Sequence, residues 1–213
     1  MSYDFILFDL DGTLTDSAEG IVNSVVYALE RKGIPYASKR ELRRFVGPPL
    51  QASFREYCGF SEEEAKEAVR IFREYFTEKG IYENTVYEGV PEMLQALYEF
   101  GFTLAVATSK PEAFAKQILE RFDLAKYFTV IAGASMDGTD KPTVIRQTLS
   151  RLHTEPSSRV LMVGDREHDI FGAKEVGVSS LGVLYGYGSE EELKEAGADG
   201  IIALPAEITS YCC

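Results

Sequence analysis

The chain has 213 residues with an ordinary hydrophobic fraction of 45%, which suits one sizeable domain or a core with a small accessory domain. Its formal net charge of −12 would repel a polyphosphate backbone, so we expect no binding to long nucleic acid, whereas a mononucleotide needs only a local site. The sequence shows no signal-peptide pattern and no apolar run near the roughly 20 residues of a spanning helix, so we expect a cytoplasmic protein, away from membranes, whose three cysteines stay reduced.

The first predicted element is a β-rich run over residues 3–8, which ends abruptly at the sequence Asp9-Leu10-Asp11-Gly12-Thr13. A buried strand of this kind delivers polar groups to a loop. Two carboxylates two residues apart repel each other unless a cation lies between them, and Mg²⁺ held by carboxylates, phosphate and waters meets that need. One carboxylate could then attack phosphorus while the other transfers the proton. The alternative is a surface turn, because Asp-Gly is a common turn pair.

The segment over residues 17–80 contains apolar side chains at helical spacing, such as Ile21 and Val25, and no convincing strand. We expect three or four amphipathic helices there, inserted after the first strand as a cap over a sheet. The predicted domains are therefore an α/β core of residues 1–16 and 81–213 and a helical cap of residues 17–80.

The rest of the chain alternates between short apolar runs and helical stretches. This alternation is typical of βαβ units and predicts a mostly parallel sheet, that is, an α/β fold with a Rossmann-like core. Prolines at positions 91, 111 and 142 stand where the first turn of a helix tolerates them. The predicted strands cover residues 102–107, 128–131, 160–163 and 180–184.

Two polar segments follow predicted strands or precede helices in the middle of the chain. Thr108 and Ser109 stand between a strand and a helix whose free N–H groups would favour a phosphate oxygen. Either hydroxyl group could instead be a plain helix cap. Lys141 immediately precedes another helix, where its ammonium group could neutralise a nucleophilic carboxylate and the phosphate that it attacks. A solvated surface lysine is the alternative.

The strand predicted over residues 160–163 also ends in acidic residues, in the order Gly164-Asp165-Arg166-Glu167-His168-Asp169. Asp165 could supply a metal ligand, and Asp169, one helical turn later, could orient metal-bound water. Asp169 could equally be a helix-start carboxylate that complements the helix dipole. Because open α/β sheets place their ligands at the carboxyl ends of their strands, we expect these polar segments to meet there.

Taken in order, these segments resemble the four motifs of the haloacid dehalogenase superfamily. The helical insertion between the first and second motifs is similar to the small cap of that superfamily. The matching residues are Asp9-Leu10-Asp11-Gly12-Thr13 in the first motif, Thr108 in the second, Lys141 in the third, and Gly164-Asp165 through Asp169 in the fourth.

The resemblance implies a role for each of these residues. Asp9 would be the nucleophile that forms an aspartyl-phosphate, and Asp11 would protonate the leaving oxygen and then activate water. Asp9, Asp165 and the backbone carbonyl of Asp11 would hold Mg²⁺, with Asp169 behind them. The transferring phosphoryl group would be held by Thr108, Ser109 and Lys141.

Asp11 favours phosphate chemistry within the superfamily, because a dehalogenase attacks carbon and typically lacks this second aspartate. The second and fourth motifs look most like those of phosphoglycolate phosphatases and related nucleotidases, and residues 44–50 resemble 5′-nucleotidases. The resemblance therefore implies a small phosphorylated metabolite as substrate, with a nucleoside 5′-monophosphate first and phosphoglycolate next. In the cap, Arg43 or Arg44 could hold an anionic leaving group, and Phe45 could stack on a base or a sugar face. The alternative is that Phe45 fills the core of the cap and both arginines are solvated.

Two other functions stay open at this point. A sugar-phosphate mutase uses the same core but returns the phosphoryl group to a substrate. A receiver-type signalling domain also combines aspartates, a hydroxyl group and a lysine on a parallel sheet, but it has no cap and carries its acidic pair on a different strand. The spacing of Asp9 and Asp11 and the helical insertion therefore favour a phosphatase, whose oligomeric state the sequence does not indicate.

Overall fold

The computed structural model describes residues 3–136 and 138–213. Its contacts divide the chain into two compact units, Met1–Thr15 with Val86–Cys213, and Asp16–Thr85. We expected the inserted unit over residues 17–80, and it instead begins at Asp16 and continues to Thr85. No helix in the described residues is long and apolar enough to cross a membrane.

The first unit is built on a six-stranded sheet in the order β5-β4-β1-β6-β7-β8. Neighbouring strands pair in parallel, as the alternation of strands and helices predicts. The central strand β1 is aligned with both of its neighbours, so that Phe8 at its end pairs with Val106 and Val163. The strands are β1 (Phe5–Phe8), β4 (Thr103–Pro111), β5 (Phe128–Ala134), β6 (Val160–Gly164), β7 (Ser179–Val183) and β8 (Gly200–Ile202).

The strand order places a switch point beside β1. From β4 the chain moves outward to β5 on one side of β1, and from β6 it moves outward through β7 to β8 on the other side. Loops that leave the carboxyl ends of strands diverge at such a point and open a crevice for ligands. The polar residues that follow β1 and β6, and those in the last part of β4, therefore stand where an α/β protein of this kind binds its substrate.

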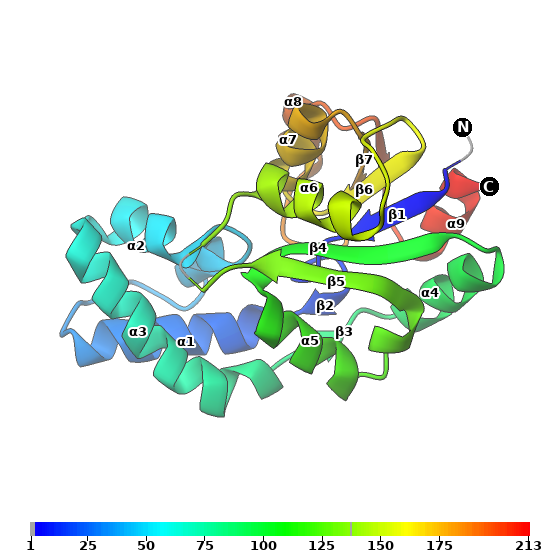
Figure 1. Cartoon of the computed structure of the whole chain (residues 1–213). Helices are drawn as coiled ribbons and strands as arrows, with labels where there is room; N and C mark the ends of the chain where they lie inside the picture. Colours follow the sequence, from blue (N-terminus) through cyan, green and yellow to red (C-terminus); the bar gives the residue numbers. More distant parts are fainter. Residues whose placement is uncertain (1–2, 137) are drawn as a thin grey trace. The chain divides into compact units, whose positions relative to one another are not determined.

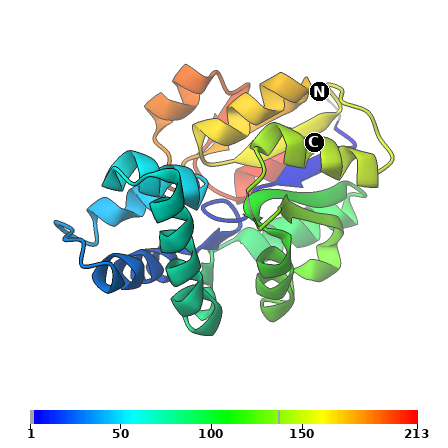
Figure 2. The same ribbon diagram turned by 60° about the vertical axis from the view of Figure 1, so that its left-hand side comes forward.

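Helices cover both faces of this sheet (Figures 1 and 2). α6 (Lys141–Arg151) and α7 (Glu167–Val176) lie on one face, and α4 (Val90–Glu99) and α5 (Glu112–Arg121) lie on the other. Because successive side chains of a strand point to opposite faces, every second residue of a strand faces α6 and α7. The resulting apolar layer includes Leu7, Ala105, Ala107 and Met162 from strands and Val144, Ile145, Leu149 and Ala173 from helices. This unit also contains α8 (Glu190–Ala196), α9 (Ala206–Cys212) and a short 3-10 turn at Ala125–Tyr127.

The second unit is helical, as its sequence pattern predicts. α3 begins after Ser61 because of a reciprocal cap, in which the Ser61 hydroxyl accepts from the backbone N–H of Glu64 and the Glu64 carboxylate accepts from that of Ser61. The core of the second unit is aromatic, because the ring of Phe54 packs against the rings of Phe45 and Phe60. The helices are α1 (Ala18–Arg31), α2 (Leu50–Cys58) and α3 (Glu62–Glu78), with short 3-10 turns at Glu41–Phe45 and Gly80–Tyr82.

Two further strands, β2 (Thr15–Asp16) and β3 (Thr85–Val86), form a separate two-stranded sheet. The chain passes from one unit to the other at each of them. Each strand has only two residues, which leaves no alternation that a sequence pattern could reveal.

Candidate active site

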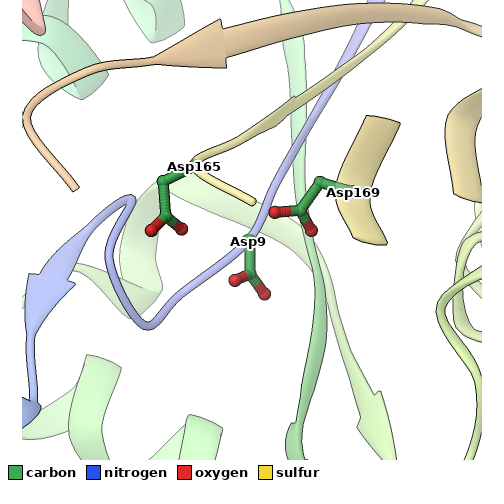
Figure 3. Close-up of side chains that lie close together, drawn as sticks. All are labelled: Asp9, Asp165 and Asp169. Atoms are coloured by element: carbon green, nitrogen blue, oxygen red, sulfur yellow. The ribbon is translucent and has the colours of Figure 1, made fainter. Parts of the chain in front are cut away.

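Three buried carboxyl groups meet at the carboxyl end of the sheet in the first unit (Figure 3). Asp9 follows β1, Asp165 follows β6, and Asp169 lies in the first turn of α7. One carboxylate oxygen from each residue lies within 4.8 Å of the others. Because β1 and β6 are neighbours in register, their ends bring Asp9 and Asp165 together, and the first turn of α7 adds Asp169 from the side.

Lys141, at the start of α6, joins this acidic cluster. Its Nζ atom lies 2.8 Å from Asp9 Oδ1 and 2.7 Å from Asp169 Oδ1, and it donates to the carbonyl oxygen of Ala107 at 3.1 Å. Burial alone would lower the pKa of Lys141, but Asp169 and Asp9 outweigh it and raise the pKa above its usual value. Lys141 is only 6% exposed, so it is a charged lysine of the interior and not a solvated one.

Asp165 carries the clearest sign of excess negative charge. Its oxygens accept hydrogen bonds from the hydroxyl group of Thr13 at 3.2 Å and from the backbone N–H of Tyr187 at 2.8 Å. Burial, with Asp169 and Asp9 nearby, nevertheless raises the pKa of Asp165 well above its ordinary value. Three close carboxylates beside Lys141 form an oxygen-rich, electron-rich site, and this donor set fits a hard divalent cation such as Mg²⁺.

The loop after β1 can approach Asp165 only because residue 12 is a glycine. Gly12 has φ of 88°, a conformation that residues with a side chain rarely adopt. A Cβ atom at this position would lie 2.2 Å from Asp165 Oδ2. The Asp-Gly pair thus belongs to a turn that is buried beside the acidic cluster, and not to the surface turn considered as an alternative.

Asp169 has the helix-start role that the sequence left open and also contacts Lys141, whereas its orienting of metal-bound water stays a prediction. Its Oδ2 atom accepts from the backbone N–H of Arg166 at 3.2 Å, as a carboxylate at a helix start does, while its other oxygen faces Lys141. Burial raises the pKa of Asp169, with Asp9 adding to the rise and Lys141 opposing it. Asp169 therefore anchors Lys141 and the start of α7 at the same time.

Thr108 and Ser109 lie within β4, because this strand continues to Pro111 and α5 begins only at Glu112. Neither residue is therefore the helix cap that we considered as an alternative. Thr108 is buried, and its hydroxyl oxygen accepts from the backbone N–H of Lys110 at 3.2 Å. Its position beside β1 brings Thr108 to the same end of the sheet as Asp9.

Lys110 is a site residue that our sequence reasoning did not single out. Its Nζ atom lies 2.9 Å from Asp11 Oδ2, and both side chains are buried. The signal is an alternation at the end of β4, where Thr108 and Lys110 are buried and Ser109 between them is half-buried. We missed it because we expected the strand to end before residue 108.

The residues suggested for specificity belong to the second unit. Phe45 is 1% exposed, and its ring centroid lies 5.0 Å from that of Phe54 and 5.4 Å from that of Tyr57. Its ring is thus part of the core of this unit, which is the alternative that we left open. Arg44 is exposed, with its guanidinium carbon 4.4 Å from the centroid of the Tyr57 ring.

Comparison with known proteins gives consistent results over most of the chain. The family described as haloacid dehalogenase-like hydrolase matches residues 6–183. A predicted phosphatase from Clostridium acetobutylicum, known from its crystal structure, superposes with a TM-score of 0.96 at 49% identity, covering 99% of this chain and 98% of that one.

Among curated proteins, a 5′-nucleotidase of Pseudomonas aeruginosa is 47% identical over 196 residues, which are 91% of this chain and 88% of the relative. A phosphoglycolate phosphatase of Vibrio parahaemolyticus is 33% identical over 203 residues, 91% of this chain and 89% of the relative. The tyrosine-protein kinase PtkA of Mycobacterium tuberculosis is 42% identical over 185 residues, 86% of this chain but 62% of that protein.

Proposed function

Since the chain belongs to the haloacid dehalogenase-like hydrolase family and is a phosphoric monoester hydrolase, we propose that it dephosphorylates a small metabolite through an aspartyl-phosphate on Asp9. Nucleoside 5′-monophosphates are the first candidate substrates and phosphoglycolate is the next. The ranking follows the relatives, because the nucleotidase is the more similar of the two.

The observation that supports this mechanism is the contact between Lys141 and Asp9. The ammonium group lies 2.8 Å from Oδ1 of Asp9, so a charge-assisted contact holds this buried carboxyl group in one orientation. An ionised carboxylate can attack phosphorus, which it would not do as a neutral acid. Lys141 would also offset the negative charge that the phosphoryl group brings to the site.

The chemistry then proceeds in two displacements at phosphorus. A carboxylate oxygen of Asp9 forms a bond to phosphorus while the bond from phosphorus to the leaving oxygen breaks, and Asp11 gives its proton to that oxygen. In the second step the oxygen of a water molecule forms a bond to phosphorus while the bond from phosphorus to Asp9 breaks. Asp11 takes a proton from the water, inorganic phosphate leaves, and the carboxylate of Asp9 is regenerated. Thr108, with Ser109 beside it, would bind oxygens of the transferring group.

The acidic cluster would hold a Mg²⁺ ion, with Asp9, Asp165 and the backbone carbonyl of Asp11 as ligands and Asp169 behind them. When bound there, the ion supplies positive charge that lets an anionic nucleophile approach an anionic phosphate. The raised pKa of Asp165 supports this assignment, because it marks a place where a cation is favoured over a further negative charge.

We assign discrimination between leaving groups to the helical unit. The site residues of the α/β unit would contact the phosphoryl group, which all candidate substrates share. Arg44 is the exposed residue of the suggested pair, and in this proposal its guanidinium group would hold an anionic leaving group. Phe45 would act indirectly, by shaping the core beneath the turn Glu41–Phe45.

A phosphate-release screen with Mg²⁺ tests the proposal. It compares nucleoside 5′-monophosphates, phosphoglycolate, sugar phosphates and pyridoxal phosphate. A preference of about 10²-fold for one class, close to 2.7 kcal/mol in transition-state binding, identifies a dedicated enzyme. Phosphate that moves to a hexose phosphate, or to a tyrosine peptide as the name of one relative suggests, without net release would refute the hydrolase.

A further inference from the structure

A second buried lysine lies beside Asp11, the residue to which we assign proton transfer. The Nζ atom of Lys110, near the end of β4, lies 2.9 Å from Oδ2 of Asp11, and the two side chains are 6% and 10% exposed. We propose that Lys110 is a positioning residue, whose ammonium group holds the carboxyl group of Asp11 in the orientation from which it exchanges a proton with the leaving oxygen. The inference rests on the proposed role of Asp11.

The two carboxyl oxygens of Asp11 have different surroundings. Oδ2 contacts Lys110, whereas Oδ1 is buried and has no hydrogen-bond partner among the described residues. Buried polar atoms in native proteins nearly always have a partner, so an exception points to a group that arrives with a ligand. Lys110 thus fixes one oxygen of the carboxyl group and leaves the other for the reacting group.

The backbone of Lys110 is well anchored. Its N–H donates to the hydroxyl oxygen of Thr108 at 3.2 Å, and it lies in an irregularity of the β4–β5 pairing, between Thr108 and Pro111, which are both paired with β5. The neighbouring strand approaches so closely that a Cβ atom at Gly133 would lie 2.5 Å from the carbonyl oxygen of Lys110. An anchored backbone lowers the entropy that must be lost to hold a long side chain in one place. The side chain of Lys110 can therefore be held in one position.

The two buried lysines of the site contact different carboxyl groups. Lys141 lies against Asp9 and Asp169, whereas Lys110 lies against Asp11. A change at Lys110 should therefore affect proton transfer to the leaving group more than the attack of Asp9 on phosphorus. This difference can be measured, because only some leaving groups need a proton.

The test compares two substrates. Nitrophenolate leaves p-nitrophenyl phosphate as a stable anion, whereas the ribose oxygen of a nucleoside 5′-monophosphate must be protonated as it leaves. Values of kcat/KM are measured with Mg²⁺ for Lys110→Met, Lys110→Arg and Asp11→Asn. Lys116→Met is the matched control, because Lys116 is half-exposed and forms its ion pair with Glu112 on the surface of α5.

We expect Lys110→Met to lower kcat/KM for the nucleotide by on the order of 10²-fold, the cost of a small misplacement of a catalytic group. The loss for p-nitrophenyl phosphate should be much smaller, Lys110→Arg should recover part of the activity, and Lys116→Met should match the wild type. In the Asp11→Asn background, Lys110→Met should add no further selective loss, because both changes act on the same step.

Equal losses on the two substrates, or no loss, would overturn the inference about Lys110. Asp11→Asn without a selective loss would instead overturn the proposed role of Asp11, so the two failures can be told apart. Thermal unfolding shows whether each variant is folded. Should Lys110→Met fail to fold, Lys110→Arg, which keeps the charge but displaces it, gives the same comparison between substrates.

Discussion

Replacing Lys141 with methionine removes the cation that lies between Asp9 and Asp169. The two ion pairs have N–O distances of 2.8 and 2.7 Å, and all three side chains are buried. Breaking a buried ion pair by removing one partner costs about 3–5 kcal/mol, because the remaining charge is left buried without compensation. Methionine keeps most of the apolar stem of lysine, so the loss in the free energy of unfolding reports the removal of the charge. A domain stability of about 5–15 kcal/mol would leave the variant folded but clearly weakened.

Urea unfolding in the presence of EDTA gives this difference directly. Lys116→Met is the control, since its exposed pair with Glu112 contributes about 0.3–0.5 kcal/mol. The loss in Lys141→Met should shrink as the pH falls, because protonation of the carboxyl groups removes the uncompensated charge. It should also shrink with Mg²⁺. If Lys141→Met unfolds within about 0.5 kcal/mol of Lys116→Met, the charge balance described for the site is wrong.

Three further predictions concern other parts of the chain. Gly12→Ala should weaken Mg²⁺ binding by about tenfold in a calorimetric titration, because its Cβ atom would lie 2.2 Å from Asp165 Oδ2 and displace that carboxylate. Unchanged affinity would contradict this geometry. Burial acts to raise the pKa of Glu192, but hydrogen bonds from a backbone N–H and from Arg166 outweigh it and lower the pKa. The contribution of Glu192 to folding stability is therefore present above the unfolded pKa and is lost as the pH falls. Glu192→Gln should be destabilising at pH 7 and nearly neutral near pH 3, as urea unfolding will show. Phe54→Ala should cost about 3–5 kcal/mol in the same assay, because this fully buried ring fills the core of the helical unit, and a cost below about 1 kcal/mol would contradict that packing.

Local sequence patterns predict the strands, the helices and the arrangement of the site with different success. The apolar run at residues 160–163 is almost the whole of β6, because a fully buried parallel strand is apolar throughout. β4 was predicted to end at residue 107 but continues to Pro111, since pairing with β5 beyond an irregularity keeps the polar residues in the sheet. That extension depends on a partner strand, which no local pattern contains.

Side-chain contacts across the fold were the least predictable part. Motif order was enough to bring Asp9, Lys141 and Asp165 to one end of the sheet, because parallel strands align their carboxyl ends. The contact of Lys110 with Asp11 depends on strand register, and the burial of Phe45 depends on which way a short 3-10 turn faces. The spacing of apolar residues determines neither the register of a strand nor the orientation of a turn.

The central claim is that Asp9 carries the phosphoryl group during turnover. Rapid acid quenching with Mg²⁺ and substrate, followed by peptide mass spectrometry, should find a phosphoryl group on the peptide that contains Asp9. Asp9→Asn should lack this peptide and release no phosphate, whereas Asp123→Asn should retain both. Asp123 is a suitable control because it is exposed and has φ of 57°, a conformation that asparagine tolerates. Full Mg²⁺-dependent phosphate release by Asp9→Asn, in protein free of host phosphatase, would contradict the mechanism.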